Sequence, residues 1–264
     1  MGKLKEFNGI YCESDYEYTF IELLKREGWK YLSGKALKRL KKTDVLITDD
    51  FIEFISSTNK TLADDEIQQI FDIVRLVGSE SDFETLHKVY NWLVDGIQFT
   101  PNDGLPQMVK LIDFEHPERN VFRLVNQLEI EYTSQGEKRP RIPDVLLYVN
   151  GFPVCITELK NPTDARATIY NAWEQINIRY WRDIPHLLHY CPLACISDGV
   201  KTRLGTVRTP YEHFYAWRRV NDGDEITTSP FAETEAMIKG VYSPKRFLEL
   251  FRDYIYFQDS IYDA

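Results

Sequence analysis

Apolar residues recur along this chain with two different periods, and the change of period divides it into helical and strand-forming stretches. Spacing of three and four residues predicts a first helix over 15–29. The same spacing predicts helices over 44–56, 63–77 and 82–94, so the segment 35–96 is expected to be helical. No catalytic spacing is found in these helices, and the segment is interpreted as scaffold or as a docking surface.

From residue 107 onward the pattern becomes one of strands rich in β-branched and aromatic residues. The strands predicted in this part are 107–114, 121–132, 145–149, 154–160 and 187–197. Between the last two, apolar residues at helical spacing predict a helix over 164–182, and a closing amphipathic helix is predicted over 244–257. Strands and helices that alternate in this order predict an α/β fold.

Length and composition are those of a globular protein that can bury a core. The 264 residues allow one large or two small domains, and 43% of them are hydrophobic. There is no apolar run of 18 residues that would predict a membrane span. The cysteines Cys12, Cys155, Cys191 and Cys195 lack zinc-site spacing, which favours a reducing cytoplasm. No phosphate-binding GxxxxGK[ST] loop is present, so this chain is not expected to bind ATP.

Charge is unevenly distributed along the chain. The formal net charge is −9, but between residues 138 and 182 there are seven Lys or Arg residues against four acids, which makes that segment +3. We expect phosphate contacts from the basic residues of this segment: Lys138, Arg139, Arg141, Arg179 and Arg182. The alternative is that these side chains form a solvated face or meet acidic patches of the chain itself.

Candidate chemistry lies at the mouth of the hairpin predicted over 145–160. Asp144 precedes the first strand, and Glu158 and Lys160 end the second, where a spacing of two places them on one face. Two carboxylates suit the binding of Mg²⁺ beside a phosphate, and an ammonium suits a developing anion. The alternative is a salt-bridged cluster that only ends the strands.

The register of this hairpin decides whether the two acids can meet. A two-residue turn at Asn150-Gly151 would place Asp144 opposite Thr157 and turn Glu158 to the other face. We therefore predict a three-residue loop over 150–152, or a bulge near Asp144 that gives the same shift.

These residues also carry a resemblance to a known family. Pro143-Asp144 followed by Glu158-Leu159-Lys160 resembles the PD-(D/E)xK nuclease motif. The longer stretches RPRIPDVLLYVNGFPVCITELKNP, YWRDIPHLL and CISDG, with VNQ, GTVRTP and FRDYIYF, resemble the N-terminal endonuclease domain of the R (restriction) subunit of type I restriction-modification enzymes. The similarity extends over nearly the whole chain.

The resemblance implies a restriction-endonuclease-like core, with a mixed central sheet flanked by helices and an inserted helical segment. It implies a single nuclease domain over 1–264, with the insertion at about 35–96, the catalytic core at about 107–217 and the closing helix leading toward a helicase-like motor domain. Asp144 and Glu158 would hold Mg²⁺, and Lys160 would lie beside the attacked phosphate.

Supporting residues are implied in the same way. A helical glutamate, interpreted here as Glu22, and a QxxxY element in the helix after the ExK motif would support the site. The chain departs from that element, because Gln175 and Tyr180 have four residues between them and would not stack one α-helical turn apart.

The implied function is Mg²⁺-dependent, sequence-nonspecific cleavage of double-stranded DNA. The implied partners are the methyltransferase and specificity subunits, while ATP would serve only the motor of the full-length subunit. A second hypothesis is a non-catalytic docking module that links the motor to the methyltransferase core.

Overall fold

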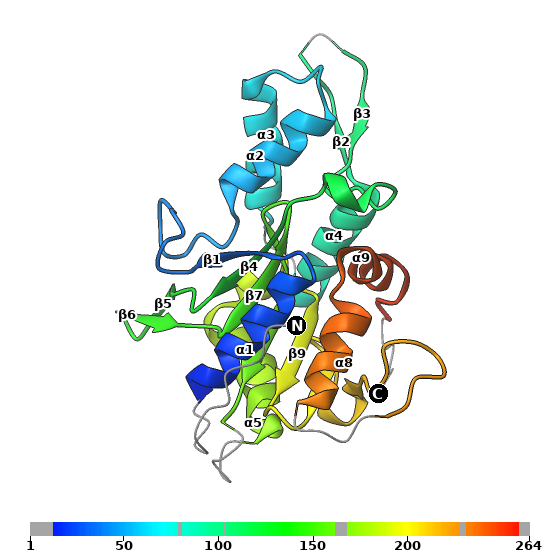
Figure 1. The fold of residues 1–264 in the computed structure, drawn as a ribbon. Helices are drawn as coiled ribbons and strands as arrows, with labels where there is room; N and C mark the ends of the chain where they lie inside the picture. Colours follow the sequence, from blue (N-terminus) through cyan, green and yellow to red (C-terminus); the bar gives the residue numbers. More distant parts are fainter. Residues whose placement is uncertain (1–12, 79–80, 103, 162–167, 227–230, 259–264) are drawn as a thin grey trace.

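The computed structural model describes residues 13–78, 81–102, 104–161, 168–226 and 231–258, and it has the predicted α/β fold (Figure 1). Its centre is a seven-stranded mixed sheet in the order β1-β4-β7-β8-β9-β10-β11. The strands are β1 (Lys30–Ser33), β4 (Phe122–Asn126), β7 (Val145–Val149), β8 (Phe152–Leu159), β9 (Leu193–Ser197), β10 (Thr202–Thr206) and β11 (Tyr215–Ala216).

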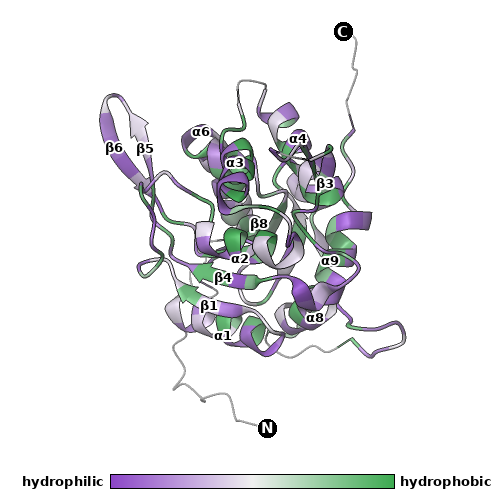
Figure 2. Cartoon of the chain, turned by 90° about the horizontal axis from the view of Figure 1, so that it is seen from above, coloured by the Kyte–Doolittle hydropathy of each residue, from purple (hydrophilic) through white to green (hydrophobic). Residues whose placement is uncertain are grey.

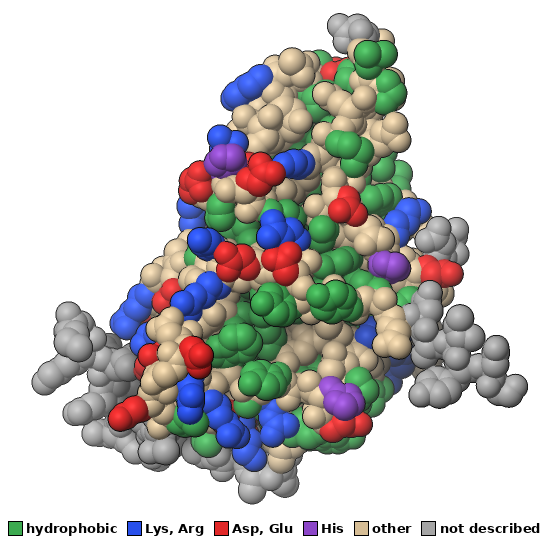
Figure 3. Space-filling view, turned by 90° about the vertical axis from the view of Figure 1, so that its right-hand side faces the viewer, with side chains coloured by type: hydrophobic (Ala, Val, Ile, Leu, Met, Phe, Trp, Pro, Cys, Tyr) green, Lys and Arg blue, Asp and Glu red, His purple; other side chains and the backbone are tan. Residues whose placement is uncertain are grey.

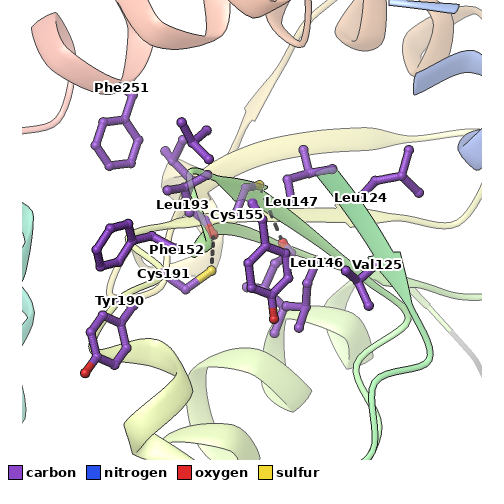
Figure 4. Packing of buried hydrophobic residues seen from close by; sticks show 14 of the residues in the cluster. Leu124, Val125, Leu146, Leu147, Phe152, Cys155, Tyr190, Cys191, Leu193 and Phe251 are labelled. Carbon is purple, nitrogen blue, oxygen red and sulfur yellow. Dashed lines mark hydrogen bonds between the residues drawn. The ribbon is translucent and has the colours of Figure 1, made fainter. Parts of the chain in front are cut away.

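The middle of this sheet is the core of the molecule. β1 and β4 pair in parallel, as do β8 and β9, and the other neighbours are antiparallel. Every residue of β7, β8 and β9 is buried, because helices cover both faces, and this explains their nearly continuous apolar sequence. Figure 4 shows Leu146, Leu147 and Cys155 of the central strands packed among other apolar side chains.

Helices lie on both sides of the sheet (Figure 2). On one side are α1 (Glu13–Arg26) and α8 (Ala232–Val241), which contact each other, and the short α6 (Trp181–Asp183) lies on the other. Before α6, the chain forms α5 (Ile169–Glu174) and the π-helical turn η2 (Gln175–Tyr180). The remaining helices of the second half are α7 (Pro185–Leu188) and α9 (Pro244–Asp253).

The helical segment extends away from the sheet at the top of Figure 1. It contains α2 (Thr48–Thr58), α3 (Asp64–Arg75) and α4 (Asp82–Asp95), close to the predicted helices. Residues 35–47 form turns and loop, so the expectation that the whole segment 35–96 is helical is wrong at its start. Ser81 caps α4, since its hydroxyl accepts from the Glu84 amide and the Glu84 carboxylate accepts from the Ser81 amide. A small sheet of β2 (Ile97–Phe99) and β3 (Gln107–Val109) follows, so the strand predicted over 107–114 is shorter than expected. The 3₁₀ turns of the chain are η1 (Pro117–Arg119) and η3 (Tyr211–His213).

Two other predicted strands have different bounds in the structure, and one strand was not predicted. The strand expected over 121–132 is interrupted at Gln127, whose φ of 50° no strand accommodates, and becomes β4 and β5 (Ile130–Ser134). The basic stretch that follows, where no strand was predicted, is the strand β6 (Glu137–Arg141), joined to β5 through a Gln135-Gly136 turn with positive φ at both residues. Residues 185–188 form a helical turn that starts at a proline, so the strand expected over 187–197 begins only at Leu193.

The β7–β8 hairpin has a two-residue turn together with a bulge. Val149 pairs with Phe152 across Asn150-Gly151, so the prediction of an odd-length connection is wrong. The pairing then jumps from Tyr148↔Pro153 to Leu147↔Cys155, which leaves Val154 as the extra residue. This bulge lies close to the turn rather than close to Asp144. It nevertheless supplies the one-residue shift that places Asp144 and Glu158 on the same side.

The turn of this hairpin is buried beneath the helical segment. Both turn residues have positive φ, 51° at Asn150 and 83° at Gly151, which is the type I′ turn that Asn-Gly favours. The Asn150 side chain accepts from the Val121 amide and donates to the Leu111 carbonyl, and the Gly151 carbonyl accepts from the Ile47 amide. The residues before α2 are therefore fixed to one end of the hairpin, and the candidate site lies at the other.

The surface is not uniformly acidic in spite of the net charge. Figure 3 shows a face on which hydrophobic side chains gather in the middle, below a mixed band of acidic and basic side chains. Local charge, rather than the total of −9, therefore decides what each part of the molecule can bind.

Candidate active site

The candidate site lies at one end of the interior strands of the sheet, where β4 and β8 end and β7 begins. Asp144 is half-buried just before β7 and is oriented by two donors. The Leu159 amide donates to Oδ2 over 2.8 Å, and Gln127 Nε2 donates to Oδ1 over 3.2 Å. Gln127 can reach Asp144 because the break between β4 and β5 occurs at this residue.

Glu158, near the end of β8, is completely buried. The Tyr180 hydroxyl donates to Oε1 over 2.7 Å and Gln175 Nε2 donates to Oε2 over 2.6 Å. Burial, followed by the charge of Asp144, raises the pKa of Glu158 well above its usual range. A hydrogen bond with the Asp144 side chain acts in the same direction, so the two carboxyl groups are close together.

Lys160 completes the cluster and is held from two sides. Its Nζ lies 3.7 Å from Glu158 Oε2 and donates to Gln175 Oε1 over 3.0 Å. Its amide donates to the Ser197 carbonyl, which continues the pairing of β8 with β9. The side chain is 14% exposed, so the ammonium is largely withdrawn from solvent. The structure thus brings Asp144, Glu158 and Lys160 together.

The π-helical turn explains how Gln175 and Tyr180 meet in spite of their spacing. In a π-helix the backbone bonds run from residue i to i+5, so residues five apart lie one turn apart. Gln175 Nε2 lies 2.8 Å from the Tyr180 hydroxyl, and both side chains bond to Glu158. The expectation that these two residues would not stack is therefore wrong, because it assumed α-helical geometry.

Glu22 is not part of this cluster. Its carboxylate pairs with Lys25 over 2.6 Å on the outer surface of α1. The acid of α1 that approaches the site is Glu17, which accepts from Asn126 Nδ2 over 2.7 Å and from Gln127 Nε2 over 3.0 Å. Glu17 directly follows the buried Tyr16 in the sequence. The sequence interpretation had instead chosen Glu22, which lies between two apolar residues. The structure thus places Glu22, the acid chosen from the sequence, outside the cluster, and the acid of α1 that shares Gln127 with Asp144 is Glu17.

The donor set fits a hard divalent cation. Two carboxylates lie together at a partly buried edge, and each of their oxygens keeps a lone pair after the hydrogen bonds described above. Within the described residues, no three or more His, Cys, Asp or Glu side chains gather into a metal-binding cluster. Mg²⁺ needs only one or two carboxylates, because water and substrate phosphate supply its other ligands. Asp144 and Glu158 are the side chains that would hold it.

Comparison with known proteins identifies the family of this chain. The profile of a family described as the type I restriction enzyme R protein N terminus matches residues 10–213. The chain belongs to this family. The matched range contains Asp144, Glu158 and Lys160 as well as the helical segment.

Individual relatives of the R protein N-terminal family match a larger share of the chain than the family profile does. The chain is 30% identical over 94% of its length to the type I restriction enzyme HindI endonuclease subunit of Haemophilus influenzae. It is 27% identical over 90% of its length to a putative type I restriction enzyme MjaIXP endonuclease subunit of Methanocaldococcus jannaschii. The chain spans about a quarter of the length of each of these relatives.

The basic residues expected to bind phosphate mostly meet acids of the chain itself. Lys138 pairs with Glu131 over 3.4 Å and Arg139 with Glu137 over 3.1 Å, on the hydrophilic β5–β6 hairpin that projects from the body in Figure 2. Arg141, at the end of β6, and Arg182 on the neighbouring helix α6 both bond to Asp183. Hydrogen bonds from Arg182, and then from Arg141, lower the pKa of Asp183. Arg179 is exposed on η2. The alternative of internal pairing thus holds for four of the five.

The helices of the R protein N-terminal domain give no sign of a membrane span. None of those in the described ranges combines the length and apolar character needed to cross a bilayer.

Proposed function

We propose that this chain is the nuclease domain of a type I restriction enzyme R subunit and that it hydrolyses phosphodiester bonds of double-stranded DNA with Mg²⁺. The observation that carries the proposal is the convergence of Asp144, Glu158 and Lys160 at the bulged hairpin. A salt-bridged strand end would not need a glutamate that is fully buried with a raised pKa.

Each side chain has a distinct part in the proposed reaction. A magnesium ion, when bound, would lower the pKa of a water and polarise the phosphate. Gln127 and the Leu159 amide orient Asp144, while Tyr180 and Gln175 orient Glu158, so that both carboxylates face one point. Lys160, aligned by Gln175, would stabilise the negative charge that develops on the phosphate.

The cleavage we propose is nonspecific in sequence, with targeting supplied by other subunits. The methyltransferase and specificity subunits and a following helicase-like motor domain are the proposed partners, because the relatives are described as endonuclease subunits of type I restriction enzymes. A cytoplasmic location belongs to the same proposal.

Plasmid nicking by the purified chain tests the proposal. Supercoiled plasmid should be cleaved with Mg²⁺ and left intact with EDTA. Lys160→Ala, Asp144→Asn and Glu158→Gln should each lower the rate by about 100-fold or more, because each removes a group that acts on the transition state or its metal.

Two glutamates on α1 provide a matched comparison in the same assay. Glu17→Gln should reduce nicking because it loosens Gln127 and hence Asp144, whereas Glu22→Gln should leave it near wild type. If the wild-type chain does not cleave in Mg²⁺, or if Lys160→Ala cleaves as fast as wild type, the nuclease proposal fails and the docking module becomes the better account.

A further inference from the structure

A second group of basic residues lies in the loop that follows β1. Between Gly34 and Lys42 the sequence GKALKRLKK contains five basic residues and no acidic residue. We refer to residues 34–42 as the basic loop. It belongs to the segment that the sequence analysis interpreted as scaffold or docking surface.

The basic loop starts beside the candidate site. The Gly34 amide donates to the Asn126 carbonyl over 2.8 Å, and Asn126 directly precedes Gln127, the donor to Asp144. A Cβ at Gly34 would lie 2.6 Å from the same carbonyl, so the backbone approach requires glycine. Lys35 and Lys41 line a groove of about 580 Å³, and Gln127 lines the same groove.

Part of the basic loop is used to hold its own conformation. The half-buried Arg39 donates to the Glu129 carbonyl over 2.7 Å and to the Asp44 carbonyl over 3.2 Å. Lys42 pairs with Glu129 over 2.6 Å, and its carbonyl accepts from the Glu131 amide. These bonds fix the loop against the strand β5, on the same side of the molecule as the β5–β6 hairpin (Figure 1).

The other three cations are exposed and uncompensated. Lys35, Lys38 and Lys41 are exposed, and within the described part of the chain no carboxylate lies at ion-pair distance from any of the three ammonium groups. The cations of the β5–β6 hairpin differ in this respect, since Lys138, Arg139 and Arg141 each pair with a carboxylate. Uncompensated lysines on an anchored loop present positive charge at a fixed place.

We propose that Lys35, Lys38 and Lys41 bind the phosphate backbone of duplex DNA and hold it beside the groove whose lining includes Gln127, the donor to Asp144. The inference rests on the proposed nuclease function and assigns its DNA-binding surface. Lysine contacts to phosphates are independent of base sequence, which suits a cleavage site whose targeting comes from elsewhere. They also provide local attraction for DNA on a chain whose net charge of −9 would otherwise repel it.

The test compares two triple variants of the 264-residue chain that have the same change in net charge. Lys35→Gln/Lys38→Gln/Lys41→Gln neutralises the basic loop. Lys60→Gln/Lys239→Gln/Lys245→Gln neutralises three exposed lysines on other elements. Fluorescence anisotropy with short labelled duplexes of two unrelated sequences gives the affinity over a series of salt concentrations, in EDTA so that cleavage does not interfere.

The basic-loop variant should bind both duplexes roughly 100-fold more weakly than wild type at low salt. Its plot of log affinity against log salt should be shallower by roughly three units, about one for each lysine. The control variant should keep the wild-type affinity and slope, and circular dichroism should show both variants folded.

The inference is overturned if the basic-loop variant and the control have the same affinity and slope, or if the wild-type chain binds neither duplex. A variant that loses affinity for only one of the two sequences would also overturn it, because phosphate contacts are shared by all sequences. Failure of the nuclease proposal would give a different result. A wild-type chain that binds DNA through this loop but does not nick plasmid in Mg²⁺ would contradict the nuclease proposal and support the DNA-binding surface.

Discussion

At the scale of single residues, Glu158 determines the character of the site. It is fully buried, it faces a second carboxyl group, and Tyr180 and Gln175 each donate to one of its oxygens. Burial opposes its ionisation, and a bound cation would favour it. The same residue therefore lowers the stability of the metal-free fold at neutral pH and would increase its affinity for a metal.

The stability of the metal-free protein should depend on pH through this residue. The pKa of Glu158 is raised in the folded state above its ordinary value of 4.5. At lower pH the carboxyl group is neutral in both states, and as pH rises past 4.5 only the unfolded state ionises freely, so stability is progressively lost. In EDTA, the melting temperature of Glu158→Gln minus that of wild type should therefore increase from acid to neutral pH.

Glu22→Gln is the control for this measurement, because Glu22 pairs with Lys25 on the surface. Its melting temperature should follow wild type at every pH, to within the small effect of a surface pair. A difference between Glu158→Gln and wild type that stays constant with pH would show that burial does not oppose the ionisation of Glu158.

At the scale of elements, the β7–β8 hairpin connects the candidate site with the helical segment. Its turn is enclosed by the residues before α2, and a Cβ at Gly151 would lie 2.3 Å from the Ile47 carbonyl. The β5–β6 hairpin has a glycine with nearly the same φ, 81° at Gly136 against 83° at Gly151, but nothing lies within 4 Å of a Cβ there. The two glycines therefore have nearly the same φ angle but different surroundings.

Alanine at these two glycines should separate backbone strain from contact. Gly136→Ala should lower the free energy of unfolding by about 1 to 2 kcal/mol, the cost of a left-handed conformation for a residue with a Cβ. Gly151→Ala should lower it by about 2 to 5 kcal/mol, since the clash with Ile47 adds to the same strain. Urea unfolding of the two variants measures the difference, and equal losses would show that the Ile47 contact relaxes freely.

At the scale of the whole molecule, three free cysteines are buried in the core, namely Cys155 on β8, Cys195 on β9 and Cys191 in the loop before β9. Burial raises the pKa of all three thiols, that of Cys195 to about 12. Since the thiolate is the reactive form, both access and ionisation are withheld while the sheet is intact.

Thiol labelling should accordingly report unfolding of the whole sheet. In a Cys12→Ser background, which removes the cysteine outside the described residues, labelling with a thiol reagent should be negligible in native buffer. It should reach three equivalents in denaturant. Its rate under mild denaturant should follow global unfolding, with a free cysteine peptide as the reference. Rapid labelling of one thiol in native buffer would instead show that β8 and β9 open locally.

Much of this molecule could be predicted from its sequence, and the failures have physical causes. Helical spacing and the Asn-Gly turn are local signals, and they located the main helices and the hairpin. The bulge at Val154 could not be located, because it depends on how a fully buried strand pairs with its neighbour rather than on its own pattern. The requirement that Asp144 and Glu158 share a face nevertheless predicted that a shift must occur.

The same difference between local and long-range causes explains which site residues could be predicted from the sequence. Glu22 was interpreted from the sequence as the supporting acid, whereas the orientation of α1 on the sheet decides which acid approaches Gln127, and that acid is Glu17. The five cations of the basic loop were not singled out in the sequence, because their position beside the site depends on the hydrogen bond of Gly34 to Asn126, residues 92 positions apart in the chain.

The π-helical turn η2 has a consequence for how relatives of this chain are compared. An additional residue in an α-helix normally rotates everything after it by about 100°, but a π turn takes up that residue locally and leaves both flanking helices in place. An alignment of this chain with sequences that have the QxxxY spacing therefore needs a gap of one residue between Gln175 and Tyr180. That gap falls within a helix, where gaps are usually penalised. A pattern search with fixed spacing would reject this chain, although its glutamine and tyrosine both bond to the Glu158 carboxylate.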